Sequence, residues 1–240
     1  MLMRRFGQYY FKLSFTAMSL MALGVFMFVG LGCWQCHRAE EKRMMLAQYE
    51  NERHKPPRVW KIGSKNPGQY QQFKVSGHYA QRFFLLDNQY HQHEWGYHVL
   101  SPFKLDAHTV VMVDRGWVKG EPLRAHFPEV ISPKDGQMIS GEAYYAHKNH
   151  WINQVDPQKI TQHAWIIAQF EPQKIEKILH QHVLPFMIRL SNTEPHGWIR
   201  DWQIVAMPPE RHQAYAFQWF SLAAMVVVVF MVTSFKRNDE

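Results

Sequence analysis

Two long stretches without a charged residue, one near each end, constrain this chain most. Among its 240 residues, no Asp, Glu, Lys or Arg occurs from Leu13 to His37, or again from Gln213 to Phe235. A helix of about twenty residues crosses the roughly 30 Å hydrocarbon core of a bilayer. A signal peptide has a shorter apolar part, of about 7–15 residues. The sequence therefore predicts two membrane spans, at 13–36 and 213–235, the first an uncleaved anchor.

The basic residues beside these spans indicate their orientation. Arg4, Arg5 and Lys12 precede the first span, and Lys236 and Arg237 follow the second. Because basic residues concentrate on the cytoplasmic side, we expect a cytoplasmic arm (1–12), a cytoplasmic tail (236–240) and a domain of residues 37–212 on the other side. The simplest placement is a bacterial inner (plasma) membrane with a periplasmic domain. The short tail leaves no room for the output module of a receptor.

The segment between the spans is predicted to be mainly β. Short β-prone runs are separated by turn formers such as Asp87-Asn88 and Ser101-Pro102, and helices are expected only at 38–53 and from Phe170 to about His182. We therefore expect an α+β extracytoplasmic domain built as an antiparallel sandwich or small barrel. The expected strands are Tyr70–Val75, Phe83–Leu86, Trp95–Leu100, Thr109–Val113, Gln137–Tyr145, Trp165–Phe170 and Phe186–Leu190.

Charge and motif content exclude several classes of function. The net charge is +7, but the region between the spans holds 22 of the 27 basic and 18 of the 20 acidic residues, without a dense basic run. Nucleic acid is therefore not an expected partner, whereas membrane lipid is. Two cysteines cannot build a disulfide framework. No phosphate-binding loop, nucleophile elbow, zinc-protease motif or convincing catalytic carboxylate pair is present, so an enzyme is disfavoured.

A C-x-x-C-H motif, Cys33-Trp34-Gln35-Cys36-His37, lies at the outer end of the first span. In c-type cytochromes two such thiols hold haem covalently and the histidine ligates its iron. A thiol-redox or copper pair is a further interpretation. The structural interpretation, two small residues at the end of a helix with an interfacial histidine, is favoured over both.

Two other motifs carry polar groups on β-prone runs. His91 and His93 would share one face of a strand and hold a metal if a third ligand joined them, although their place at a hairpin tip favours no metal. Arg115, Gly116 and Trp117 follow Asp114 at the end of an apolar run. They form either the rim of a binding surface or an Asp–Arg pair beside a core tryptophan, of which the second is favoured.

The start of the second span carries a stripe of chemically useful side chains. At 100° per residue, Tyr215, Ala216, Trp219 and Ala223 fall within about 60° of His212. An imidazole at the membrane boundary can ligate haem iron, and small alanines beside aromatic rings would leave room for a flat macrocycle. The residue pattern alone favours an ordinary interfacial aromatic belt.

Six motifs, in order between the two spans, together resemble the surfeit locus protein 1 family, whose members assist the assembly of haem–copper terminal oxidases. Trp34-Gln35 belongs to the first motif, which favours coincidence as the origin of the C-x-x-C-H pattern around it. The motifs are Leu31-Gly32-x-Trp34-Gln35-x-x-Arg38-x-x-x-Lys42, Gly77-x-Tyr79 with Leu86-Asp87-Asn88, Gly96-Tyr97-x-Val99 with Pro102, Val113-Asp114-Arg115-Gly116-Trp117-Val118, Asn153-x-x-Asp156-Pro157, and His212-x-x-Tyr215-Ala216-x-x-Trp219-Phe220-x-Leu222-Ala223.

The resemblance implies a non-catalytic assembly factor for cytochrome c oxidase that binds haem a transiently. Such a factor supports haem insertion into subunit I or stabilises that subunit. The family's second-span histidine ligates haem, and by position it is His212, with Tyr215 and Trp219 beside it. Subunit I is the expected partner, with haem a synthase and other oxidase assembly factors as further ones. The alternative is a membrane-anchored electron carrier or thiol-redox protein that uses Cys33, Cys36 and His37.

Overall fold

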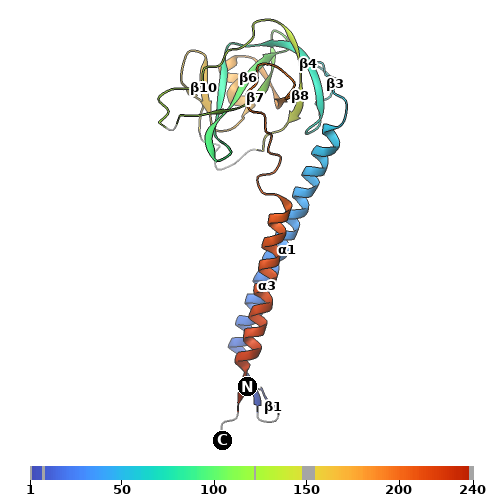
Figure 1. Cartoon of the computed structure of the whole chain (residues 1–240), viewed down its shortest axis with the longest axis vertical. Helices are drawn as coiled ribbons and strands as arrows, with labels where there is room; N and C mark the ends of the chain where they lie inside the picture. Colours follow the sequence, from blue (N-terminus) through green and yellow to red (C-terminus); the bar gives the residue numbers. More distant parts are fainter. Residues whose placement is uncertain (1, 7–8, 122, 148–154, 238–240) are drawn as a thin grey trace. The chain divides into compact units, whose positions relative to one another are not determined.

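The computed structural model describes residues 2–6, 9–121, 123–147 and 155–237 (Figure 1). They fall into two compact units. One unit, called the helical unit below, joins Met1–Ala47 to Gln203–Glu240, and the other, the barrel unit, is Gln48–Trp202. Each unit is described by itself.

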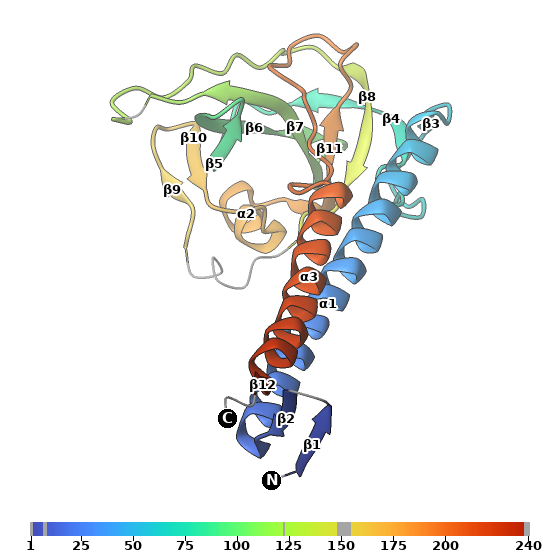
Figure 2. The same ribbon diagram turned by 60° about the horizontal axis from the view of Figure 1, so that its bottom comes forward.

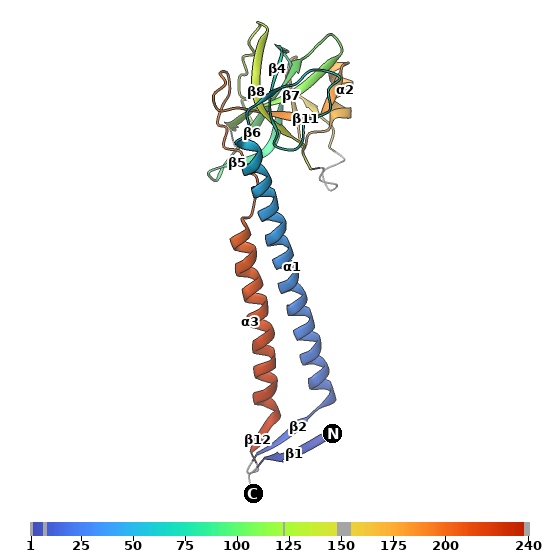
Figure 3. The same ribbon diagram turned by 90° about the vertical axis from the view of Figure 1, so that its right-hand side faces the viewer.

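Two long apolar helices make up most of the helical unit. Helix α1 (Phe15–Arg53) begins here, and its last residues enter the barrel unit, while α3 (Pro209–Ser234) runs antiparallel to it (Figures 2 and 3). Strand β2 (Tyr9–Leu13) pairs antiparallel with both β1 (Leu2–Phe6) and β12 (Phe235–Arg237). The prediction that the first helix continues into 38–53 is confirmed. The most apolar 18-residue windows of the helices have mean hydropathies of 1.9 and 2.0, and both helices are long enough to cross a membrane.

Close approach of the two helices depends on small residues in α1. A Cβ atom added to Gly32 would lie only 2.6 Å from the ring of Phe220, so no larger side chain fits there without movement of that ring. Farther along the pair, the Phe28 ring stacks on Trp219 with ring centroids 5.8 Å apart. The pair follows the common rule that small residues let neighbouring helices pack closely.

A small barrel with a sheet extension forms the other unit. The strand order is β3-β4-β8-β11-β7-β6-β5-β10-β9, and an additional β4–β6 pairing closes β4, β8, β11, β7 and β6 into a ring. The elements are β3 (Arg58–Val59), β4 (Gln72–Tyr79), β5 (Phe83–His91), β6 (Glu94–Lys104), β7 (Thr109–Lys119), β8 (Gln137–Tyr144), β9 (Gln158–Lys159), β10 (Ala164–Ile167), α2 (Pro172–Leu179) and β11 (His182–Leu190).

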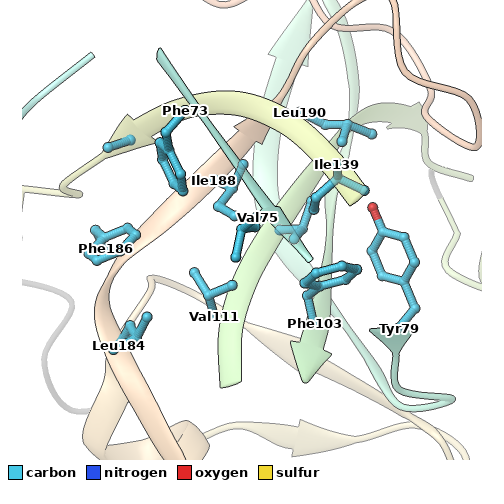
Figure 4. Close-up of a cluster of buried hydrophobic side chains, with 12 residues drawn as sticks. Phe73, Val75, Tyr79, Phe103, Val111, Ile139, Leu184, Phe186, Ile188 and Leu190 are labelled. Carbon is cyan, nitrogen blue, oxygen red and sulfur yellow. The ribbon is translucent and has the colours of Figure 1, made fainter. Parts of the chain in front are cut away.

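Successive residues of β7 serve two different cores. Val111 and Val113 belong to the cluster inside the barrel, with Phe73, Phe103 and Phe186 (Figure 4). Val110 and Met112 belong to a second cluster that α2 covers with Ile175 and Leu179. Because side chains alternate between the two faces of a strand, a strand buried on both faces reads as a continuous apolar run.

A third cluster lies under a part of the chain without regular structure. Leu85, Tyr97 and Val99 are buried there, and Phe127, Val130 and Trp198 pack against them. Phe127 and Val130, in the long segment between Lys119 and Asp135, therefore supply part of the cover over β5 and β6.

The structure corrects three expectations about the barrel unit. Asp87-Asn88 is not a turn but an irregularity inside β5, where the register shifts and Asn88 has φ +59°. Ser101-Pro102 lies inside β6, where that strand changes partner from β5 to β4, a position that tolerates the missing proline N–H. The barrel is also mixed, because β11 runs parallel to β7 across a long connection that includes β8, β10 and α2.

Candidate functional site

A buried histidine joins the two helices of the helical unit. His212 is 7 % exposed, and its Nδ1 lies 2.7 Å from Oε1 of Gln35, which is 9 % exposed. A carboxamide oxygen can only accept a hydrogen bond, so Nδ1 carries the proton and donates. In that tautomer Nε2 holds a lone pair, and no hydrogen bond to Nε2 is present among the described residues. An imidazole held in this way can act as a metal ligand through Nε2.

Local sequence explains why these two side chains meet. Gly32, Gln35 and Ala39 are the buried residues of α1, and their spacing of three and four places them on one helix face. On α3, His212 and Ala216 are buried four residues apart. Proline at the first helical position, as at Pro209, suits the start of a helix and places His212 in its first turn. Gln35 gives one signal in the sequence, as a polar residue on an apolar helix face, but that signal does not indicate its partner.

The other residues of the predicted stripe are separated by the packing. Trp219 stacks on Phe28, whereas Tyr215 is 42 % exposed on the outside of α3. Ala216 and Ala223 are 4 % and 6 % exposed. These alanines, which the sequence suggested as room for a macrocycle, are therefore buried in the helical unit. Of the three predicted cofactor residues, His212 is held by its hydrogen bond to Gln35 and Trp219 by its ring contact with Phe28.

The C-x-x-C-H motif lies within the unbroken helix α1. Cys33 and Cys36 are free and exposed, and His37 is also exposed, whereas their neighbours Gln35 and Ala39 are buried. No group of three His, Cys, Asp or Glu side chains able to hold a metal is found in the part of the chain that the structure describes. Among the described residues, therefore, no His, Cys, Asp or Glu side chain completes a metal site at the motif.

Arg115 is 2 % exposed in the barrel unit. Nε donates to the carbonyl oxygen of His196 at 2.8 Å, Nη1 to the Ser101 hydroxyl at 3.3 Å and Nη2 to the carbonyl oxygen of Ile131 at 3.1 Å. Its Cζ lies 5.0 Å from the ring centre of Tyr79 and 4.7 Å from that of Trp198. Burial lowers the pKa of Arg115. These contacts tie residues 131 and 196–198 to the barrel and make the role of Arg115 structural.

The expected Asp–Arg pair at this strand end is wrong. Asp114 is held instead by Nδ1 of His98 at 2.8 Å and by the Gly116 N–H at 3.0 Å, because adjacent residues of a strand face opposite sides. Gly116 has φ +112°, and a Cβ atom there would lie 2.6 Å from the Ile199 carbonyl oxygen. Glycine is therefore required at this junction.

The Trp117 indole N–H donates to the carbonyl oxygen of Gln89 at 3.1 Å, and its backbone N–H donates to that of Ile199 at 2.7 Å. Trp117 is 5 % exposed and is therefore a core tryptophan. Arg115, Gly116 and Trp117 together hold the strand end and the segment around Ile199, and do not form an open rim.

The second histidine motif forms a hairpin tip, as expected. Gln92 and His93 have φ values of +49° and +67°, as in the tight turns that suit β-hairpins. The His91 ring lies 5.3 Å from the Trp117 ring, and its Nδ1 is 3.9 Å from an Asp201 carboxylate oxygen. These contacts give His91 a structural environment. The motif at Asn153 lies outside the described residues.

Comparisons with known proteins identify the family of this chain. The model of the SURF1 family matches residues 22–224 and so includes α1 from Ala22 onward, the barrel unit and most of α3. The chain is also similar to a SURF1-like protein of Rickettsia bellii (strain RML369-C), with 25 % identity over 217 residues that cover 87 % of this chain and 86 % of the relative. SURF1 proteins are a family of assembly factors, not a known enzyme family, and are generally linked to cytochrome oxidase assembly. A match over most of its length shows that this chain belongs to the SURF1 family.

Proposed function

We propose that this protein assists the assembly of cytochrome c oxidase, a haem–copper terminal oxidase, by binding haem a transiently at His212. It then supports insertion of the haem into subunit I or stabilises that subunit. The observation that carries the proposal is the His212–Gln35 hydrogen bond, which leaves Nε2 as the unpaired ring nitrogen. Family membership supports the link to the oxidase, and the helical unit supplies the ligand chemistry.

The residues around His212 fit a haem ligand site in two respects. Gln35 fixes the tautomer and ring orientation, as carbonyl partners do for metal-binding histidines. Trp219 is held against Phe28, and the exposed Tyr215 offers a second aromatic ring on the same helix. When bound, haem would supply an iron that an imidazole nitrogen can ligate. His212 would hold the iron, with Tyr215 and Trp219 as flanking rings.

Apolar side chains on the outside of the helices support a membrane location. Phe26 is 80 % exposed, Leu20 70 %, Phe217 73 % and Val232 68 %. Large apolar residues exposed in such numbers along a helix pair are stable in lipid, where they need no further burial. We infer insertion into the bacterial inner membrane, with both termini cytoplasmic and the barrel unit periplasmic. The reason is that basic residues precede the first apolar stretch and follow the second.

Partners follow from the proposed task. A factor that hands over haem a must contact the subunit that receives it, so subunit I is the expected partner, with haem a synthase and other assembly factors as further ones. Insertion of haem requires no covalent bond to be made or broken at the protein, and the proposed role is non-catalytic.

Haem content of the purified protein tests this proposal. The full chain, His212→Ala and the control His37→Ala are purified in detergent from cells that make haem a, and absorption spectra give the haem-to-protein ratio. His37 is an exposed histidine on α1, so its loss removes an imidazole without touching the buried pair. We expect about tenfold less haem in His212→Ala and an unchanged ratio in His37→Ala. Equal haem content in all three proteins would contradict the assignment.

A further inference from the structure

The barrel unit has a hollow near the end of β4 whose lining is mostly polar and carries one sign of charge. Its volume is about 590 Å³, and five basic residues but no Asp or Glu line it. We call it the basic hollow. Tyr79 and Leu179, both buried, supply apolar lining. The five basic residues are His78, Arg82, Lys104, Lys134 and His163.

The backbone of the barrel unit brings these residues together from distant parts of the chain. The β4–β6 pairing that closes the barrel places His78 opposite Lys104. Where β5 begins, the Phe83 N–H donates to the carbonyl oxygen of His163 at 2.8 Å and so fixes that residue beside the hollow. The basic residues are therefore gathered by main-chain contacts and not by acidic side chains between them.

Arg82 is fixed in place and retains donors for a ligand. Its Nη1 donates to the Ile178 carbonyl oxygen at 2.8 Å, and its Cζ lies 5.6 Å from the ring centre of Trp165. A guanidinium carries five N–H donors, and within the described ranges neither Nε nor Nη2 of Arg82 has a hydrogen bond. A guanidinium held in one orientation is suited to bind two oxygens of a phosphate or carboxylate group.

The protein does not neutralise the charge of the basic hollow. In the part of the chain that the structure describes, the other four basic side chains have no ion pair and no hydrogen bond. Acidic residues near the lining in sequence are engaged elsewhere or lie outside it. Asp106 accepts from two backbone N–H groups, and Glu176 binds His182. Asp135 follows Lys134 in the chain but is not part of the lining.

The chemistry of the lining indicates the class of ligand. Charges of one sign in a concave site focus the electrostatic field and attract ions of the opposite sign. Lysine and arginine bind phosphate and carboxylate oxygens through charge-assisted hydrogen bonds. One phosphate group would meet only some of the five basic side chains, whereas several such groups on one molecule could meet most of them. The buried Tyr79 and Leu179 offer contact to the carbon skeleton of such a molecule.

We propose that the basic hollow binds a compact polyanion, a small molecule that carries two or more phosphate or carboxylate groups. Arg82 binds one of these groups with its planar donors, and Lys104 and Lys134 bind the others as point charges. All of the lining belongs to the barrel unit. The site goes beyond the proposed function, and its test needs no haem.

Isothermal titration calorimetry of the full chain in an uncharged detergent tests the proposal, at a constant ionic strength of about 0.1 M. The probes are tripolyphosphate, citrate and orthophosphate. We expect one tripolyphosphate or citrate to bind per chain, and orthophosphate to bind at least tenfold more weakly. The tighter of the first two probes shows whether the hollow prefers phosphate or carboxylate groups. Failure of both to bind, or equal affinity for orthophosphate, would overturn the proposal.

Matched variants then place the bound probe in the hollow. Lys104→Gln with Lys134→Gln removes two charges from the lining and should lower the affinity about tenfold or more. The control, Lys61→Gln with Lys74→Gln, removes the same net charge at one exposed and one half-buried lysine outside the lining, and should leave the affinity unchanged. Equal losses in the two double variants would show attraction by the net charge of the chain and overturn the site.

A single exposed substitution keeps the test independent of folding. Lys134 is exposed, so Lys134→Glu reverses one charge of the lining without disturbing the core. We expect a severalfold loss of affinity in this variant, and native affinity in Lys61→Glu, the same change at an exposed lysine outside the hollow. Native affinity in Lys134→Glu would overturn the proposal.

Discussion

Each of the two units buries a nitrogen-rich side chain, Arg115 in the barrel unit and His212 in the helical unit, and the two are held in opposite ways. Arg115 in the barrel unit donates to two carbonyl oxygens and a hydroxyl and lies against two aromatic rings. His212 in the helical unit has one polar partner, Gln35, and one ring nitrogen without a hydrogen bond among the described residues. A buried group that donates its hydrogen bonds to the surrounding protein stabilises the fold. A buried ring with one nitrogen left without a hydrogen bond is available to a ligand. The comparison assigns structure to Arg115 and function to His212.

The largest effect expected from this comparison is on the stability of the barrel. Arg115→Met leaves the carbonyl oxygens of Ile131 and His196 and the Ser101 hydroxyl without their donor, and should lower the free energy of unfolding by about 3–5 kcal/mol. Urea unfolding of the full chain in detergent, followed by tryptophan fluorescence, measures this.

Arg124→Met is the control for that experiment. Arg124 stacks on Trp95, with Cζ 5.0 Å from the ring centre, and pairs with Asp87, but its side chain is 45 % exposed. Exposed pairs are worth less than about 1 kcal/mol, so its loss should be nearly neutral. Equal losses of unfolding free energy in the two variants would contradict the structural role of Arg115.

A second prediction concerns the ring beneath Arg115. Burial raises the pKa of Tyr79 from 10.0 to about 12. Since its folded-state pKa lies above the unfolded value, the neutral phenol is favoured in the fold, and stability falls as the pH rises from 10 to 12, because only the unfolded chain ionises. The loss should approach about 2–3 kcal/mol.

Unfolding measured at pH 9, 10, 11 and 12 checks this prediction. Tyr79→Phe has no proton to lose and should show a correspondingly shallower alkaline decline than the native chain. Parallel curves for the two proteins would show that this phenol does not resist ionisation in the barrel.

A smaller effect is expected at the partner of His212. Gln35→Leu removes the acceptor for Nδ1–H and so frees the ring to turn and to change tautomer, which typically lowers metal affinity by about tenfold or more. Haem titration in detergent, read by absorption, measures the affinity. Gln48→Leu, the same change at an exposed position of α1, should leave the affinity unchanged, and an equal loss there would contradict the role of Gln35.

The smallest effect is expected at the C-x-x-C-H motif. Replacement of both Cys33 and Cys36 by Ser should leave haem content unchanged and stability within about 0.5 kcal/mol, as for other exposed positions. Denaturing gel electrophoresis followed by haem staining should show no haem on the native chain. A stained band that disappears in the double variant would instead support an electron carrier with covalently bound haem. A change in the function of the native chain after cysteine alkylation would support a thiol-redox protein.

Sequence patterns predicted the parts of the molecule that local chemistry determines. Uncharged runs of sufficient length indicated α1 and α3, and β-branched residues indicated β7. Pairings between distant strands left no local trace: the β4–β6 closure depends on residues 78–79 meeting 103–104, and the parallel β7–β11 pair on a connection through several other elements. Pro102 indicated a turn in the sequence. A proline is tolerated inside β6 because that strand changes its pairing partner there from β5 to β4, and only the closed barrel shows this change.

The candidate site, too, could be predicted from the sequence only in part. His212 was identified from helix periodicity and family resemblance, but Gln35 belongs to the other helix, and no spacing rule connects two residues 177 positions apart. The alanines near His212 were correctly placed on its side of α3, yet their burial in the helical unit follows from packing that sequence alone does not specify. The neighbouring positions of Asp114, Arg189 and Glu142 on the barrel also escaped notice, because each is a single charged residue in its own strand and only the register brings them together.

Chemical rescue tests the central claim most directly, that His212 ligates haem through Nε2. His212→Gly, purified in detergent without haem, is titrated with haem a in the absence and presence of free imidazole, with absorption and electron paramagnetic resonance spectra recorded. We predict weak binding without imidazole, and restored affinity with the native axial-imidazole spectrum when imidazole is added. Native affinity and spectrum in His212→Gly without imidazole would contradict the account.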